Sequence, residues 1–102
     1  MINDKRLRLI GLAARAGKIR CGTFITEKLI KENKAPLVII AGDGSEKQTD
    51  KIIHLCEKNS AEYEVMSTKE ELGAILGRDE VLCLVVSDIN FINGIKSQNG
   101  GA

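Results

Sequence analysis

Two uninterrupted apolar runs constrain the fold of this chain more than any other feature of its sequence. They are Leu37 to Ala41 and Val81 to Val86, and neither alternates between apolar and polar residues. Because the side chains of a strand point alternately to its two sides, a strand that is apolar throughout suits the middle of a sheet buried on both faces. We therefore expect helices to cover both faces of a sheet that contains these two strands.

Helical and strand patterns alternate along the rest of the chain. Helices are expected over about 4–16, 23–34, a segment that includes 49–56 and ends near 59, 68–77 and 88–96, with shorter strands over 18–21 and 63–66. A length of 102 residues leaves room for one domain. The pattern predicts a single α/β domain over 1–96, a three-layer α/β/α sandwich with a mixed central sheet of about four strands. The polar, glycine-rich segment 97–102 is expected to be a flexible tail.

The cysteines and the histidine give no sign of a metal site or a disulfide framework. Cys21, Cys56 and Cys83 lie far apart beside apolar residues, without a C-x-x-C pair. We expect each cysteine to be a small buried apolar residue and His54, which lies among charged residues, to be exposed. No cofactor or metal ion is expected. The apolar runs are too short to cross a membrane, and the N-terminus lacks a secretory signal, so we expect a cytoplasmic protein.

Two aspartates follow the apolar runs closely. Asp43 and Asp88 lie where open α/β sheets place their sites, which would suit hydrolysis or phosphoryl transfer. Each also precedes a predicted helix, where aspartate is a preferred N-cap, and we favour that interpretation. The segment Gly42 to Ser45 lacks the spacing of a dinucleotide loop and the lysine of a Walker sequence. We expect neither an enzyme nor a small-molecule substrate.

The charges are divided unevenly between the two parts of the chain. Up to Pro36 there are nine Lys or Arg and three acidic residues, a net charge of +6, and the remainder carries −5. A basic half of this kind is typical of a surface that binds a polyanion. Charge alone leaves open the alternative that these side chains only cover solvated helix faces.

The second predicted helix carries an aromatic residue between two lysines. Helical spacing places Lys28 and Lys31 on either side of Phe24, away from the apolar arc of the helix. A helix N-terminus and lysines bind phosphate, and an exposed aromatic ring stacks on unpaired bases, which indicates RNA. Upstream, Lys18 and Arg20 leave the same face of their strand, so we expect all four cations to converge. The alternative is that Phe24 covers the sheet edge or packs against the helix start.

Several motifs extend over nearly the whole chain. They are Gly11 to Lys18, Gly22 followed six residues later by Lys28, Ala35 to Ala41 with Asp43, the helix of Cys56, and Thr68 to Gly73. Together they resemble the kink-turn RNA-binding ribosomal proteins of the L-seven-Ae and L-thirty-e type, most closely the small bacterial YlxQ-like members. The resemblance implies an α/β/α sandwich that binds structured or ribosomal RNA, with the ribosome as a candidate partner. It places the RNA site at the turn from the first strand to the second helix, helped by the loop before the last strand.

The expected RNA-binding residues combine the resemblance with the charge pattern. The resemblance implies Lys18, Arg20, Gly22, Lys28 and, in the helper loop, Arg78, and the residue pattern adds Arg15, Thr23, Phe24 and Lys31.

The sequence departs from the kink-turn pattern in two places. Family members that read sheared G·A pairs carry Asn and Glu where this chain has Phe24 and Ile25, and neither replacement can make their base-edge hydrogen bonds. The helper loop, Gly77 to Glu80, also lacks the apolar residues that lean on an extruded base. We expect non-enzymatic RNA binding without tight kink-turn specificity. The alternative is a protein–protein interaction module on the same fold.

Overall fold

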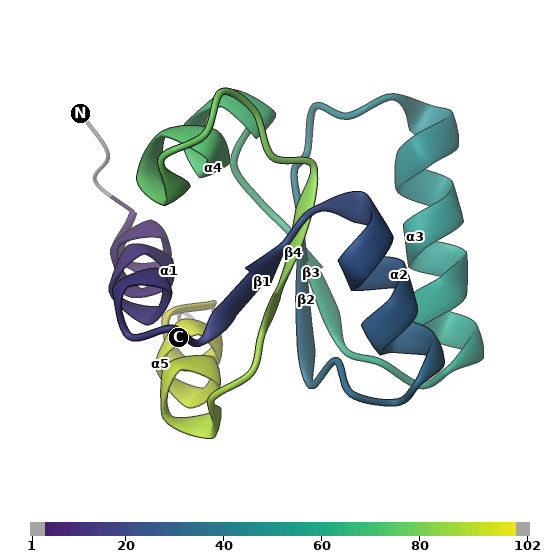
Figure 1. Ribbon diagram of the computed structural model, residues 1–102, viewed down its shortest axis with the longest axis horizontal. Coiled ribbons are helices and arrows are strands. Elements are labelled where there is room, and N and C mark those ends of the chain that lie inside the picture. The colour runs from purple at the N-terminus through teal and green to yellow at the C-terminus, as the bar shows by residue number, and fades with distance from the viewer. Residues whose placement is uncertain (1–3, 100–102) are drawn as a thin grey trace.

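Helices cover both faces of a four-stranded sheet in the computed structural model, which describes residues 4–99 (Figure 1). The elements are α1 (Lys5–Arg15), β1 (Ile19–Cys21), α2 (Thr23–Lys31), β2 (Leu37–Ile40), α3 (Glu46–Lys58), β3 (Tyr63–Val65), α4 (Lys69–Leu76), β4 (Cys83–Val86) and α5 (Ile89–Asn99). Helices α1, α4 and α5 lie on one face, and α2 and α3 lie on the other. The predicted three-layer α/β/α sandwich is confirmed. Within residues 4–99, every helix is too short or too polar to cross a lipid bilayer.

The sheet is mixed, with strand order β1-β4-β2-β3. Strands β2 and β3 are parallel, and β4 is antiparallel to both β1 and β2. The two apolar runs therefore supply the two central strands, as predicted. This order brings the carboxyl ends of β1, β2 and β3 and the amino end of β4 to one edge of the sheet, which we call the carboxyl edge.

The central strands contribute side chains to two separate hydrophobic clusters. Leu37 and Ile39 of β2 point into the cluster under α1, α4 and α5, whereas Val38 and Ile40 point into the cluster under α2 and α3. Strand β4 alternates in the same way. Since all these side chains are fully or almost fully buried, both layers of helices are held by the same pair of strands.

Several element ends differ from the sequence-based expectation. Helix α2 ends at Lys31 rather than residue 34, because Asn33 adopts a left-handed conformation (φ 59°) that closes the helix. Strand β4 begins at Cys83, since the N–H of Val81 donates to the carbonyl of Lys69 instead of a neighbouring strand. Helix α5 continues to Asn99, so residues 97–99 are helical rather than part of a tail. The rest of the expected tail, 100–102, lies outside the described residues.

The two aspartates after the apolar runs both accept hydrogen bonds from helix N-termini. Asp88 accepts from the N–H of Asn90 and caps α5 as expected. Asp43 does not cap the helix that follows it, because Ser45 takes that position in α3. Instead, Asp43 Oδ1 accepts from the N–H of Lys69 at 2.8 Å and ties the loop after β2 to the start of α4.

The three cysteines differ in burial. Cys56 and Cys83 are fully buried, whereas Cys21 is only half-buried, contrary to the expectation that all three are core residues. Cys21 lies on the edge strand β1, which leaves one side of it uncovered. Burial raises the pKa of the Cys56 thiol to about 11, and burial likewise raises the pKa of the Cys83 thiol.

Native Cys56 and Cys83 are expected to resist alkylation at pH 8, while Cys21 reacts. Each unit by which the pKa is raised lowers the thiolate fraction about tenfold, and only the thiolate attacks iodoacetamide. Mass spectrometry of timed samples, native and in urea, measures this difference. Rapid native modification of Cys56 and Cys83 would contradict the packing described above.

The raised pKa of Cys56 in the folded protein also makes the stability of the fold depend on pH. This stabilising contribution is fully present below pH 9.0 and is lost as the pH rises to about 11.

Candidate nucleic-acid interface

A pocket at the carboxyl edge joins the turn after β1 to the loop before β4. Its volume is about 380 Å³. It is lined by Cys21, Gly22, Thr23, Gln48, Lys69, Arg78, Glu80, Val81 and Leu82. Three of the nine sequence-predicted site residues, Gly22, Thr23 and Arg78, therefore share one pocket. The starts of α3 and α4 contribute Gln48 and Lys69 to the same pocket.

Gly22 shapes the turn from β1 into α2. Its backbone has φ 121° and ψ 150°, a conformation that only glycine adopts readily. Its N–H donates to the carbonyl of Cys83, and its carbonyl accepts from the N–H of Thr26 in the first turn of the helix. A substitution with any side chain would strain this turn.

Helix α2 begins without a side-chain cap, because its N-cap is Gly22. Among the described residues, the other helices have side-chain caps at Asp4, Ser45, Thr68 and Asp88. The first N–H groups of α2 therefore have no competing side-chain acceptor at the N-cap. Together with the helix dipole, they form a surface that favours an anion such as phosphate.

Phe24 projects into solvent at the start of α2. Its side chain is 82% exposed, so it does not cover the sheet edge. Thr26 and Ile30 form the buried side of the helix, as its apolar arc predicts. Lys28 lies one turn after Phe24, and its Nζ is 3.8 Å from Glu32 Oε2 in an exposed ion pair, a type that is only weakly stabilising. Lys31 is also exposed and continues the same side of the helix.

The two basic residues around β1 lie differently with respect to the turn. Ile19 and Cys21 pack toward the α1 side of the sheet. The side chain of Arg20, between them, therefore projects from the α2 side, where it is exposed. Lys18 precedes β1, and its carbonyl accepts from the N–H and Oγ of Ser87 at the opposite edge of the sheet. Lys18 and Gly22 are thus separated by roughly 13 Å along the extended strand. The structure does not bring Lys18 to the turn, so the four cations do not converge there.

Arg15 also lies outside the pocket. It lines a groove between α1 and α4 together with Ala74 and Ile75. The end of α1 is connected to the amino end of β1, on the far side from the turn into α2 (Figure 1). Of the nine predicted residues, Arg15 and Lys18 therefore lie near the amino end of β1, and Lys31, in the last turn of α2, lies roughly 13 Å from Gly22 along the helix.

Two residues at or next to this pocket lie in the Thr68 to Gly73 motif but were not predicted as site residues. Gly73 in α4 is buried, and a Cβ built on it would lie 2.6 Å from the carbonyl oxygen of Asp79 and 2.8 Å from that of Arg78. The absence of a side chain lets the loop lie directly on the helix, where the N–H of Arg78 donates to the carbonyl of Gly73. Lys69 lines the pocket at the first residue of α4, with its Nζ 4.0 Å from Glu80 Oε1.

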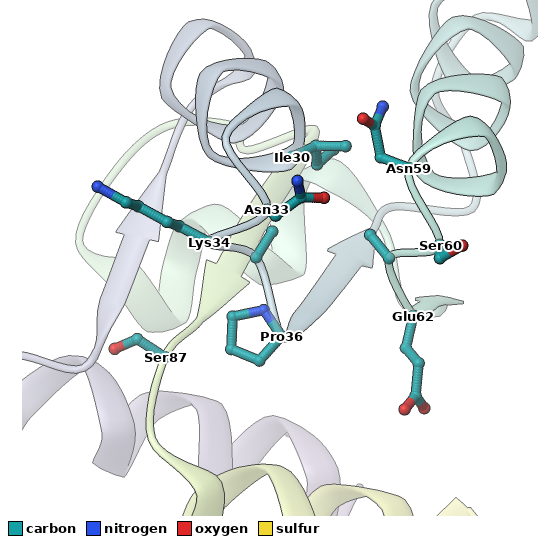
Figure 2. Close-up of a pocket in the computed structure, with 10 residues that line it drawn as sticks. Ile30, Asn33, Lys34, Pro36, Asn59, Ser60, Glu62 and Ser87 are labelled. Carbon is teal, nitrogen blue, oxygen red and sulfur yellow. The ribbon is translucent and has the colours of Figure 1, made fainter.

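A larger pocket, of about 510 Å³, lies at the opposite edge of the sheet (Figure 2). The ends of α2 and α3 form it, with Asn33 and Asn59 among its lining residues. Figure 2 shows Lys34 and Glu62 extending away from each other rather than toward a common point. Helix C-termini present carbonyl groups and negative partial charge, which disfavours a polyanion there. Within residues 4–99, no group of three or more His, Cys, Asp or Glu side chains is arranged to hold a metal ion.

Comparison with known proteins gives a family match over most of the chain. Residues 4–93 match the model of the ribosomal protein L7Ae/L30e/S12e/Gadd45 family. A solved structure described as that of a protein with unknown function from Bacillus halodurans C superimposes with a TM-score of 0.86 at 26% identity. The superposition covers 93% of this chain and 96% of that one.

Sequence relatives agree with the family match. The chain is 29% identical over 89 residues to the RNA-binding protein YlxQ of Bacillus subtilis (strain 168), covering 87% of this chain and 89% of that protein. It is 35% identical over 79 residues to the RNA-binding protein YlxQ of Enterococcus faecium, covering 74% and 73%. It is also 32% identical over 76 residues to the large ribosomal subunit protein eL8 of Nitrosopumilus maritimus (strain SCM1), covering 72% and 58%.

Proposed function

Because the chain belongs to the ribosomal protein L7Ae/L30e/S12e/Gadd45 family, we propose that it is a non-enzymatic protein that binds structured RNA at the carboxyl edge of its sheet. One observation carries the proposal: Gly22 and Thr23 share a pocket with Arg78, beside a helix N-terminus that no side chain caps. Two relatives are named RNA-binding proteins and a third is a ribosomal subunit protein, which supports ribosomal RNA as a ligand and the ribosome as a partner.

The proposed contacts divide into phosphate binding and base stacking. A phosphate is held by the N–H groups at the start of α2 and by the side chain of Arg78. A neighbouring base stacks on Phe24, whose ring is exposed to solvent. Lys28 and Lys31 follow the RNA backbone along α2.

Two further cations contribute to the same interface. Arg20 extends the basic surface from β1 on the α2 side of the sheet. Lys18 contacts RNA that passes the far end of β1, because it lies roughly 13 Å from the turn. Binding spread over separated cations and one aromatic ring recognises RNA mainly by its shape and charge.

The two residues that stand in place of the Asn and Glu of kink-turn readers support broad rather than tight RNA specificity. Phe24 offers a ring instead of an amide, and Ile25 is half-buried. The Cγ2 of Ile25 lies 3.9 Å from the position that a Cβ would take on Gly22, so this side chain packs on the turn itself. Neither side chain donates or accepts a hydrogen bond at a base edge.

Lys28→Ala is expected to weaken binding to every RNA tested and to reduce its salt dependence. If four or five phosphates are neutralised, the slope of log K against log salt is about −3 to −4 for RNA with single-stranded character, and each lost contact lowers its magnitude by about 1. Fluorescence anisotropy at several salt concentrations measures both effects.

Lys58→Ala provides the matched control for this experiment. Lys58 is an exposed lysine in the last turn of α3, near the opposite edge of the sheet. Its removal should leave both affinity and slope unchanged. An equal loss in the two variants would mean that the binding surface lies elsewhere, and a wild-type slope near zero would exclude RNA binding through phosphates.

A further inference from the structure

Helix α1 presents a row of basic residues with a leucine among them. Lys5, Arg8, Leu12 and Arg15 are spaced three or four residues apart and therefore share one side of the helix. All four are exposed, and the buried residues of α1 lie on the opposite side. The exposed fraction of Leu12 is 51%.

Two hollows adjoin along this side of α1. One, of about 400 Å³, lies between α1 and α4 and is lined by Arg8, Gly11, Leu12, Arg15, Ala74 and Ile75. The other, of about 290 Å³, is lined by Lys5, Arg8, Leu9 and Leu12. Because they share Arg8 and Leu12, they form one strip that follows α1 for about 15 Å. We call this strip the α1 groove.

Gly11 leaves part of the α1 groove open, and the packing inside the protein does not explain why this position is glycine. A Cβ built on Gly11 meets no atom within 4 Å, and its φ is not in the left-handed region. Glycine in the interior of a helix is less stable than alanine. Neither packing nor backbone conformation therefore requires glycine here, whereas a side chain would occupy part of the groove.

The charges of the α1 groove point to an acidic partner. Among the described residues, Lys5, Arg8 and Arg15 form no ion pair, so three positive charges surround the apolar floor. RNA would pair with the cations but would gain little from Leu12 and Ile75, which are apolar. An amphipathic acidic helix satisfies both, because its carboxylates face the cations while its apolar residues fill the groove.

We propose that the α1 groove is a docking site for an acidic, leucine-bearing helix of a protein partner. The partner helix lies alongside α1 and packs as a third helix against α1 and α4, with apolar side chains at i, i+4 and i+7 seated on either side of Leu12. This surface is separate from the pocket at the carboxyl edge, so its occupation does not depend on RNA binding.

A synthetic peptide tests this proposal with the full chain. The probe is a fluorescent 16-residue helical peptide with leucines at i, i+4, i+7 and i+11 and glutamates on the flanking positions. We expect saturable binding that weakens at least tenfold with Leu12→Glu. The matched control is Ile89→Glu, because Ile89 is 62% exposed on α5, outside the groove, and its replacement should leave affinity unchanged.

Gly11→Ala separates docking from folding. The substitution should raise the melting temperature by about 3–8 °C, since alanine is the better helix former, while weakening peptide binding. A purely structural glycine would not give these two effects together. Absence of peptide binding to the wild type, or equal binding of a peptide with serines in place of leucines, would overturn the proposal.

Two other occupants of the α1 groove are distinguished by the same variants. If Leu12→Glu weakens RNA binding as much as loss of Phe24 does, the groove binds RNA and the docking proposal is wrong. If the wild type is a dimer that Leu12→Glu converts to a monomer in light scattering, the groove is occupied by a second copy of the chain, which also overturns it.

Discussion

Phe24→Ala is expected to weaken RNA binding by about 5- to 150-fold, because stacking of a base on an exposed aromatic ring contributes roughly 1 to 3 kcal/mol. The melting temperature should hardly change, since the side chain is 82% exposed and leaves no cavity when removed. Titration with a structured RNA and a thermal melt of the same samples measure the two quantities. The combination of a large loss of affinity and an unchanged fold is the result expected of a binding residue.

The other phenylalanine of the chain is the matched control. Phe91 on α5 packs against the cluster under α1, α4 and α5 and is half-buried. Phe91→Ala should lower the melting temperature while leaving the affinity of the remaining folded protein unchanged. Unchanged RNA affinity of Phe24→Ala, with a marked fall in its melting temperature, would make Phe24 a structural residue and leave the RNA proposal dependent on charge alone.

The sequence predicts the fold well because its strongest patterns are local. A strand that is apolar at every position is buried on both faces, so it is expected between two layers of helices. Leu37 to Ile40 lies between two such layers. The exposure of Phe24 follows in the same way from the spacing of Thr26 and Ile30 within one helix. In both cases the pattern and its consequence lie within one element.

Predictions that required two elements to meet were less successful. Lys18 and Arg15 carry the right charge, but β1 takes its direction from pairing with β4, which places Lys18 beside Ser87. Asp43 precedes α3 in the sequence yet accepts a hydrogen bond from the N–H of Lys69 at the start of α4, because parallel β2 and β3 bring their ends together. Lys69 escaped notice as a site residue for the same reason.

Gly73→Ala is expected to destabilise the protein by about 1 to 3 kcal/mol, as overpacking of a well-filled site usually does. Alanine is the better helix former by about 1 kcal/mol, but the added Cβ would lie 2.6 Å from the carbonyl oxygen of Asp79, which is backbone and cannot rotate away. The steric term therefore prevails. For a chain of this size, each kcal/mol lowers the melting temperature by about 4–8 °C. Displacing the loop also moves Arg78 away from the pocket, so RNA affinity should fall as well.

The same substitution elsewhere in a helix should have the opposite effect on stability. Gly11→Ala adds a Cβ to open space in α1 and is expected to stabilise the fold, so the comparison separates steric conflict from helix propensity. At a temperature where all variants are folded, Gly73→Ala should lose about as much RNA affinity as Arg78→Ala, and the double variant should lose little more, because both changes remove the same contact. Full additivity of the two losses would show that Gly73 does not act through Arg78. A Gly73→Ala protein as stable as the wild type would show that the close approach of the loop to α4 is not required for folding.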